Sequence, residues 1–176
     1  ITFGPAETAT NGGDLSVANG RYLKVSVSFT RASSGESPVL YDLTLSTNEE
    51  PNCDDAVASP AMLWPPNHQF ETVAITGVTD PDGDSVTVTV TGVMQDEQVP
   101  GPGKPHSPDA MNLGASVDLR VERDGTGNGR VYHVSFTADD GNGGTCAGEV
   151  TVCVPPAQST PVGCVDGGPL YDSTLP

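Results

Sequence analysis

The sequence predicts an all-β fold, and three observations support this prediction. Strong helix formers are sparse, whereas Val and Thr, which favour extended backbone, are abundant. Several segments alternate apolar and polar residues with the two-residue period of a strand that has one buried face. Gly and Pro, which separate such segments with turns, number 21 and 16 of the 176 residues. These features are typical of a loop-rich protein built from short strands.

Two alternating segments near the N-terminus predict a β-hairpin. Residues 21–29 and 39–45 each place their apolar side chains on one face, and the residues between them favour a long turn. A two-stranded hairpin alone is marginally stable in water. We therefore expect residues 1–50 to belong to an incomplete sandwich, completed either by a strand of a neighbouring subunit or by strands outside this chain. The polar, Pro-containing residues 49–52 predict the domain boundary.

Residues 51–156 contain the strands of a second, complete sandwich. Alternation predicts strands at residues 56–64, 69–78, 85–94, 116–122, 130–138 and 146–154. One further short strand is expected in or beside the Pro-rich loop at 95–114, and imperfect alternation predicts a β-bulge within 69–78. Seven or so short strands over about 100 residues are typical of an immunoglobulin-like antiparallel β-sandwich. Residues 157–176 form a Pro/Gly-rich tail without periodicity.

The four cysteines predict two disulfides. They include no CxxC pair and are too widely spaced for a usual zinc site, so an extracellular, oxidising location is indicated. In the predicted topology the first and last strands can lie parallel and adjacent, which favours a bond between Cys53 and Cys146. Cys153 is out of phase with the inward valines of its strand, so it faces outward and is expected to pair with Cys164 of the tail.

Charge excludes several classes of partner. The net charge is −16, and the seven basic residues are scattered, so nucleic acids and anionic membranes are not expected as partners. No apolar run approaches the roughly 18 to 20 residues that span a bilayer. The chain opens at Ile1 without a signal sequence, and we interpret it as a mature or excised piece.

The predicted topology gathers one group of acidic loops at the same end of the sandwich. These loops lie before the first strand, between the second and third strands, and between the last two strands. Asp residues at positions i, i+2 and i+4 around a Gly can point several oxygens inward, and such hard ligands suit calcium. The alternative is that Asp and Gly only form solvated turns. The predicted calcium ligands are Asp55, Asp80, Asp82, Asp84, Asp139 and Asp140.

A second, weaker calcium site is predicted toward the opposite end, at Asp96, Glu97 and Asp109. There the alternative is an exposed ion-pair network with Arg120 and Arg123. The three histidines show no metal-ligand spacing. His133 occupies an outward strand position, which predicts a solvated side chain. Trp64 is expected to cover the core or an edge rather than to stack on a sugar.

The sequence carries no motif of the common catalytic sites. The patterns GxSxG, HExxH and GxxxxGK[ST] are absent. Paired carboxylates can serve a glycosidase, but these lie in hydrophilic turns rather than in a cleft. We therefore expect no enzymatic activity.

Four motifs resemble one kind of bacterial protein module. They are Leu63-Trp-Pro-Pro-Asn-His68, Val78-Thr-Asp-Pro-Asp-Gly-Asp84, Asn128-Gly-Arg-Val-Tyr-His133 and Phe136-Thr-Ala-Asp-Asp-Gly141. Together they resemble an immunoglobulin-like or cadherin-like module of large secreted and surface-attached bacterial proteins, over about residues 53–155. The resemblance implies calcium-type loops at Asp80, Asp82 and Asp84, and such modules are found as spacers, adhesins and appendages to enzymes.

These observations lead to one functional hypothesis and one alternative. The hypothesis is a non-catalytic, extracellular structural or adhesion module, stabilised by calcium. If its N-terminal strands complete a neighbouring copy, repetition head to tail would build a filament. Its partners would then be further copies or neighbouring domains. The alternative is a carbohydrate-binding or accessory module of a secreted polysaccharide-degrading enzyme, with a surface glycan as the partner.

Overall fold

The computed structural model describes residues 8, 24–30, 40, 43–45, 47–98, 106–157 and 163–175. The chain divides into two compact units, Ile1–Leu45 and Ser46–Pro176. In the first unit, residues 24–30 and 43–45 form no strand and are exposed. The remainder of the predicted hairpin lies outside the described residues, so the hairpin stays a prediction. The division falls a few residues before the expected boundary, because the polar junction belongs to the second unit.

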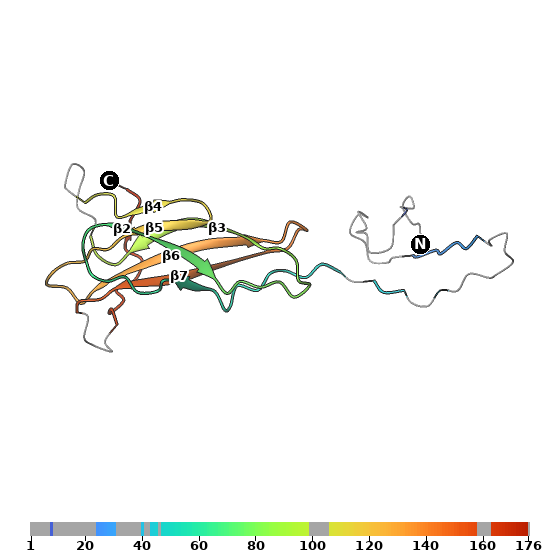
Figure 1. Cartoon of the computed structure of the whole chain (residues 1–176), viewed down its shortest axis with the longest axis horizontal. Helices are drawn as coiled ribbons and strands as arrows, with labels where there is room; N and C mark the ends of the chain where they lie inside the picture. Colours follow the sequence, from blue (N-terminus) through green and yellow to red (C-terminus); the bar gives the residue numbers. More distant parts are fainter. Residues whose placement is uncertain are drawn as a thin grey trace. The chain divides into compact units, whose positions relative to one another are not determined.

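The second unit is a sandwich of two antiparallel sheets (Figure 1). One sheet has the order β1-β2-β5-β4, and the other has the order β7-β6-β3-β8. If the first seven strands are lettered A to G, these sheets are ABED and CFG, the arrangement of an immunoglobulin-type sandwich. The predicted fold class is therefore confirmed for this unit. The strands are β1 (Val57–Ser59), β2 (Phe70–Thr76), β3 (Thr87–Gln95), β4 (Ala110–Asn112), β5 (Ser116–Arg120), β6 (Arg130–Asp139), β7 (Thr145–Val154) and β8 (Tyr171–Asp172).

The core lies between the two sheets and includes many of the inward residues that alternation predicted. Every second residue is buried on β5 and in the C-terminal half of β7, whereas β6 buries all of its first five residues. The short strand expected near the Pro-rich loop is β4. No helix among the described residues is both long and apolar enough to cross a membrane. The largest side chains that are fully buried include Tyr132, Phe136, Leu119, Val73, Val117, Val134 and Val152.

The β-bulge lies in β3, and its prediction within residues 69–78 was wrong. β2 keeps a continuous register with β5 from Phe70 to Ala74. In β3, Val90 pairs with Phe136 and Gly92 pairs with the next residue of β6, so Thr91 is the extra residue. The bulge reverses which face of the strand points inward. As a result Val90 and Val93 are both buried although they are three positions apart.

The first strand changes its pairing from one sheet to the other on either side of Pro60. After β1 pairs with β2, Met62 forms a parallel bridge to Cys153 of β7. The first and last strands therefore run parallel and adjacent, as the topology predicted. Both expected disulfides, Cys53–Cys146 and Cys153–Cys164, are present.

The C-terminal tail is part of the sandwich. Its strand β8 extends the sheet at the edge of β3, with Tyr171 opposite Gln95. Ser173, which directly follows β8, donates its N–H to the Val93 carbonyl at 3.0 Å. Its own carbonyl accepts hydrogen bonds from the N–H groups of Asp109 and Ala110. The tail thus joins the edges of the two sheets. A two-residue strand has no detectable period, which is why the sequence did not predict it.

Candidate functional site

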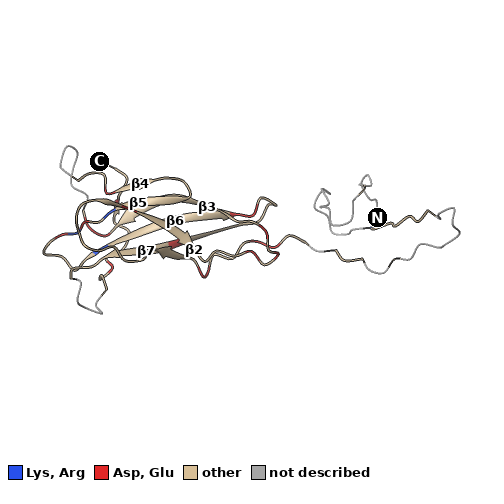
Figure 2. Ribbon diagram, in the orientation of Figure 1, with Lys and Arg blue, Asp and Glu red and all other residues tan. Residues whose placement is uncertain are grey.

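The described basic residues of the second unit gather at one end of the sandwich, whereas acidic residues lie at both ends (Figure 2). The only basic residues in its described part, Arg120, Arg123 and Arg130, lie where β5 ends and β6 begins; we call this the arginine end. The opposite end, where β2 and β6 end, carries carboxylates with no Lys or Arg among the described residues; we call this the acid end. Its members are Glu49, Glu50, Asp54, Asp55, Asp80, Asp82, Asp84, Asp139 and Asp140.

Three of the predicted calcium ligands converge at the acid end. Each of Asp80, Asp82 and Asp84 offers a carboxylate oxygen that lies within 4.8 Å of the other two. The loop folds on itself because Asp80 Oδ1 accepts hydrogen bonds from the N–H groups of Asp82 at 2.9 Å and Asp84 at 3.2 Å. Gly83 permits this tight loop, since its φ of 84° is a conformation that side chains with a Cβ rarely adopt.

The three carboxylates differ in how they are satisfied. Asp82 Oδ2 accepts a hydrogen bond from the Glu49 N–H at 2.7 Å, and Asp84 Oδ2 accepts one from Asn142 Nδ2 at 2.8 Å. These bonds link the loop to the junction before β1 and to the loop after β6. Asp80 Oδ2 is buried and has no hydrogen-bond partner in the structure. A buried carboxylate oxygen without a partner is costly, and the residue that carries it is a member of the converging group.

The other predicted ligands at this end stay apart from the group. Asp140 Oδ2 accepts a hydrogen bond from Asn48 Nδ2 at 2.8 Å, and Oδ1 accepts bonds from the N–H groups of Asn142 and Gly144. The Asn48 bond is the main cause that lowers the pKa of Asp140, with burial opposing it and the backbone bonds adding to it. Asp139 accepts a hydrogen bond from the Gly141 N–H. Asp55 lies at the same end, outside the converging group.

At the arginine end, a buried ion pair takes the place of an exposed network. The Arg130 and Asp109 side chains are 3% and 0% exposed, and Nη1 lies 2.8 Å from Oδ2. Arg130 Nε also donates to Glu97 Oε2 at 3.1 Å. The Tyr132 hydroxyl accepts a bond from Arg130 Nη1 and donates to the Arg120 carbonyl, and burial raises the pKa of this tyrosine. Arg130, which the sequence analysis did not single out, is the centre of the network.

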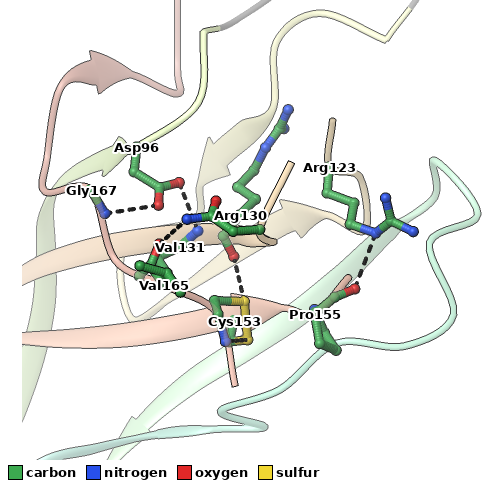
Figure 3. The surroundings of a disulfide bond; sticks show 10 residues. Asp96, Arg123, Arg130, Val131, Cys153, Pro155, Val165 and Gly167 are labelled. Carbon is green, nitrogen blue, oxygen red and sulfur yellow. Dashed lines mark hydrogen bonds between the residues drawn. A yellow bond between two sulfur atoms is a disulfide. The ribbon is translucent and has the colours of Figure 1, made fainter. Parts of the chain in front are cut away.

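The residues of the second predicted calcium site are therefore engaged within the protein. Asp109 also accepts a hydrogen bond from Gln95 Nε2 and faces Arg120 Nε at 3.6 Å. The Asp96 carboxylate accepts bonds from the N–H groups of Val131 at 2.8 Å and Gly167 at 3.2 Å (Figure 3). Of the two arginines expected here, Arg120 takes part.

Arg123 lies outside this network. It donates to the carbonyls of Pro155, Pro156 and Asp124. Ion pairs with arginine are present at this end, but they are largely buried and centred on Arg130 rather than exposed around Arg120 and Arg123. Calcium is proposed below only for the acid end.

His133 is buried, and the expectation of a solvated side chain was wrong. It points away from the core as predicted, but the tail covers it. Its Nδ1 lies 2.8 Å from Glu149 Oε1 on β7, and its Nε2 lies 2.9 Å from Asp166 Oδ1 of the tail. Burial by itself would lower the pKa of His133, but the hydrogen bonds to the two carboxylates outweigh it, so the pKa is raised.

A third group of potential ligands was missed by the sequence analysis. His68, His106 and Glu122 come from three separate segments, yet one ligating atom of each lies within 4.8 Å of the others. Their spacing along the chain, 38 residues between the histidines and 16 more to the glutamate, matches no metal-binding motif. Only the tertiary structure brings them together.

Comparisons of the chain with protein-family models, curated proteins and solved structures found no match. The fold and the two ends define the class of the second unit: a disulfide-bonded, immunoglobulin-type β-sandwich with converging carboxylates at one end. The resemblance to bacterial surface modules remains a hypothesis. It agrees with the convergence of the three aspartates but is independent of it.

Substitution of Asp109 by Asn is predicted to destabilise the second unit by about 3–5 kcal/mol, because it leaves Arg130 buried without a compensating charge. Urea denaturation measures this loss. The exposed carboxylate of Asp54 supplies the control, and Asp54→Asn should change the free energy of unfolding by no more than about 0.5 kcal/mol. Equal effects of the two substitutions would contradict a stabilising role for the buried pair.

The contribution of His133 to stability is predicted to be lost as pH rises. A protonated imidazole can donate to both Glu149 and Asp166, whereas a neutral one can donate to only one of them. The folded pKa lies above the ordinary value of 6.5, so this contribution is fully present below pH 6.5 and disappears as pH passes the folded pKa.

Urea midpoints of the wild type and of His133→Gln, measured across this range, isolate the effect. Their difference should shrink toward high pH. A difference that does not change with pH would show that His133 has the same pKa in the folded and unfolded chain, and would contradict the prediction.

Proposed function

We propose that this chain is a non-catalytic, extracellular structural or adhesion module whose acid end is stiffened by calcium. The observation that carries the proposal is the convergence of Asp80, Asp82 and Asp84 with one buried oxygen unpartnered and no basic residue nearby in the described unit. Calcium takes carboxylate oxygens in flexible geometries. It would offset the repulsion among the three carboxylates and stabilise the folded state by mass action.

The contacts of the aspartate loop suggest what calcium would stiffen. Asp82 accepts a hydrogen bond from the backbone of Glu49, and Asp84 accepts one from the side chain of Asn142. The loop therefore contacts both the junction before β1 and the loop after β6. Asn48 of the same junction is held by Asp140. An ion bound at the aspartates would therefore also order residues 48 and 49, where the chain enters the sandwich. Stiffening at the entry to a module suits a structural or adhesive role.

The extracellular location rests on the disulfides and on the resemblance. Disulfides persist in oxidising compartments and are rare in the cytosol. One bond here links the segment before β1 to β7, and the other fastens the tail to β7. The motifs at residues 63–68 and 80–84 resemble those of secreted and surface-attached bacterial proteins, which supports the same location.

Self-association through the N-terminal strands is the proposed mode of assembly. In the described part of the first unit, Val25, Val27 and Phe29 alternate with polar residues and are 42–51% exposed. This is the pattern of a strand whose apolar face needs a partner. Pairing with another copy would bury that face by β-strand addition, and repetition of a head-to-tail contact would give a filament.

The described aromatic residues do not favour the carbohydrate-binding alternative. In the second unit, the exposed ones are Trp64 and Tyr171. Trp64 follows the segment that bridges to β7, whereas Tyr171 pairs with β3, so they lie toward opposite edges of the β7-β6-β3-β8 sheet. Two separated rings do not make a row for stacking on sugars.

Calcium is predicted to raise the free energy of unfolding of the wild type and to have little effect on Asp80→Asn. Asparagine retains the oxygen that accepts the two backbone bonds but places an amide nitrogen, which is no calcium ligand, at the free position. At free calcium about 100-fold above Kd, the expected gain is about 2.7 kcal/mol. Chemical denaturation with calcium or chelator measures it.

Asp54→Asn is the matched control, because it removes a carboxylate of the same end that lies outside the converging group. It should respond to calcium as the wild type does. If calcium does not change the free energy of unfolding of the wild type, the aspartates form only solvated turns. If calcium stabilises Asp80→Asn as much as the wild type, the ion binds at another position.

Assembly is predicted to depend on the apolar face of the first unit. Light scattering over a dilution series should show particles larger than one chain for the wild type, and Val27→Asp should reduce them because a charge would be buried on pairing. Ser28→Asp, on the neighbouring polar position, is the control. A wild type that stays monomeric at all concentrations would contradict self-association and leave the proposed calcium site unaffected.

A further inference from the structure

We propose that His68, His106 and Glu122 form a binding site for a zinc ion at the arginine end of the sandwich. This site is separate from the aspartates in position and in chemistry, and the inference does not rest on the calcium proposal. His68 lies just before β2, His106 lies before β4, and Glu122 follows β5. A bound ion would therefore join three segments that no disulfide connects.

The three side chains already form one contact group. His68 Nδ1 lies 2.9 Å from Glu122 Oε2. The two imidazole rings stack with their centroids 4.3 Å apart and their planes 21° from parallel. One ligating atom of each residue lies within 4.8 Å of the other two. Zinc bound to nitrogen and oxygen at about 2.0–2.2 Å holds its ligand atoms roughly 3 to 3.5 Å apart, so binding requires the ligand atoms to draw closer and the stacked rings to turn.

Backbone contacts hold the two histidines beside the glutamate. The N–H of His68 donates to the Val121 carbonyl, one residue before Glu122. Arg120 Nη1 donates to the His68 carbonyl at 2.9 Å. The same guanidinium donates through Nε and Nη2 to the Pro108 carbonyl, two residues after His106. Arg120 is therefore a positioning residue that ties both histidine segments to the end of β5.

Both histidines have an unusual backbone conformation. Among the described residues other than glycine, only His68 and His106 have positive φ, at 62° and 73°. Histidine reaches this region more often than most residues, yet it remains a strained choice. Such conformations persist where the surroundings impose them, and they concentrate at functional sites. Here both positive φ angles belong to the stacked histidines beside Glu122. This backbone conformation is the second observation in favour of a ligand.

The donor set selects the class of ion. Two imidazole nitrogens and one carboxylate suit zinc, whereas calcium and magnesium prefer oxygen ligands. Three protein ligands leave a fourth position for water or for a group of another molecule. Glu122 is nearly buried and fixed, while the side chain of His68 is 50% exposed. His106 is exposed too, so its ring can turn until one nitrogen of His106 and one nitrogen of His68 point at the ion. Zinc would replace the hydrogen bond between His68 and Glu122.

The test is titration of the intact, disulfide-bonded chain with Zn²⁺ by calorimetry, in the presence of calcium so that the aspartates do not compete. We expect one zinc site per chain, and at least about tenfold weaker affinity in His106→Asn, because loss of a ligand costs no less than loss of an outer partner. Asparagine tolerates the same backbone conformation. His106 is exposed, so the variant should remain folded, and its urea midpoint in the absence of metal verifies this.

Asp54→Asn is the matched control, since it removes a carboxylate of the acid end that lies outside the converging group and should leave zinc affinity unchanged. Absorption of Co²⁺ in place of zinc provides a second readout, and the visible bands of a four-coordinate ion should be lost in His106→Asn. Zinc binding of equal affinity in His106→Asn, or no binding by the wild type, would overturn the proposal and leave these residues as a hydrogen-bonded surface group. Neither result bears on the response to calcium.

Discussion

The buried ion pair between Arg130 and Asp109 organises one whole end of the sandwich. Asp109 stands immediately before β4, and its N–H reaches the tail at Ser173, while Arg130 opens β6. Through Glu97 the pair also holds the segment that follows β3. Burial of two charges is costly unless they are paired and hydrogen-bonded. The pair therefore favours the arrangement of strand ends and tail in which Arg130 and Asp109 are in contact, over arrangements that would separate the two charges.

The two ends of the molecule satisfy their charges in different ways. At the arginine end, guanidinium groups pair with the buried carboxylate of Asp109 and with Glu97. At the acid end, the described residues include no such cation, and backbone N–H groups and asparagine side chains provide the hydrogen bonds instead. Hydrogen bonds lower the pKa of Asp140 but leave the negative charge in place. An external cation is the remaining means of balancing it, which is the physical basis for proposing calcium there.

The tail connects these features to the edge of the sandwich. Unpaired strand edges are sites of unwanted pairing with other chains, and proteins commonly cover them. Here β8 covers part of β3, the Cys153–Cys164 disulfide fastens the tail beside β7, and Asp166 reaches His133. The tail thus covers part of one edge of the sandwich.

Short-range patterns in the sequence determined the class of fold. Alternation placed β5, β6 and β7 correctly, and the phase of Cys153 relative to Val152 and Val154 assigned its disulfide partner. The loop of Asp80, Asp82 and Asp84 was also predictable, because its turn chemistry is local. Each of these inferences depends on residues within a few positions of one another, whose relative directions follow from backbone geometry.

Only the tertiary structure decided the rest. It placed the bulge at Thr91, made Arg130 rather than Arg123 the centre of the ion-pair network, and covered His133 with the tail. It also brought His68 and His106 beside Glu122. These outcomes depend on contacts between residues far apart in the chain. The energy of a buried charge or of a covered side chain is set by such neighbours, and no local pattern records which neighbours they will be.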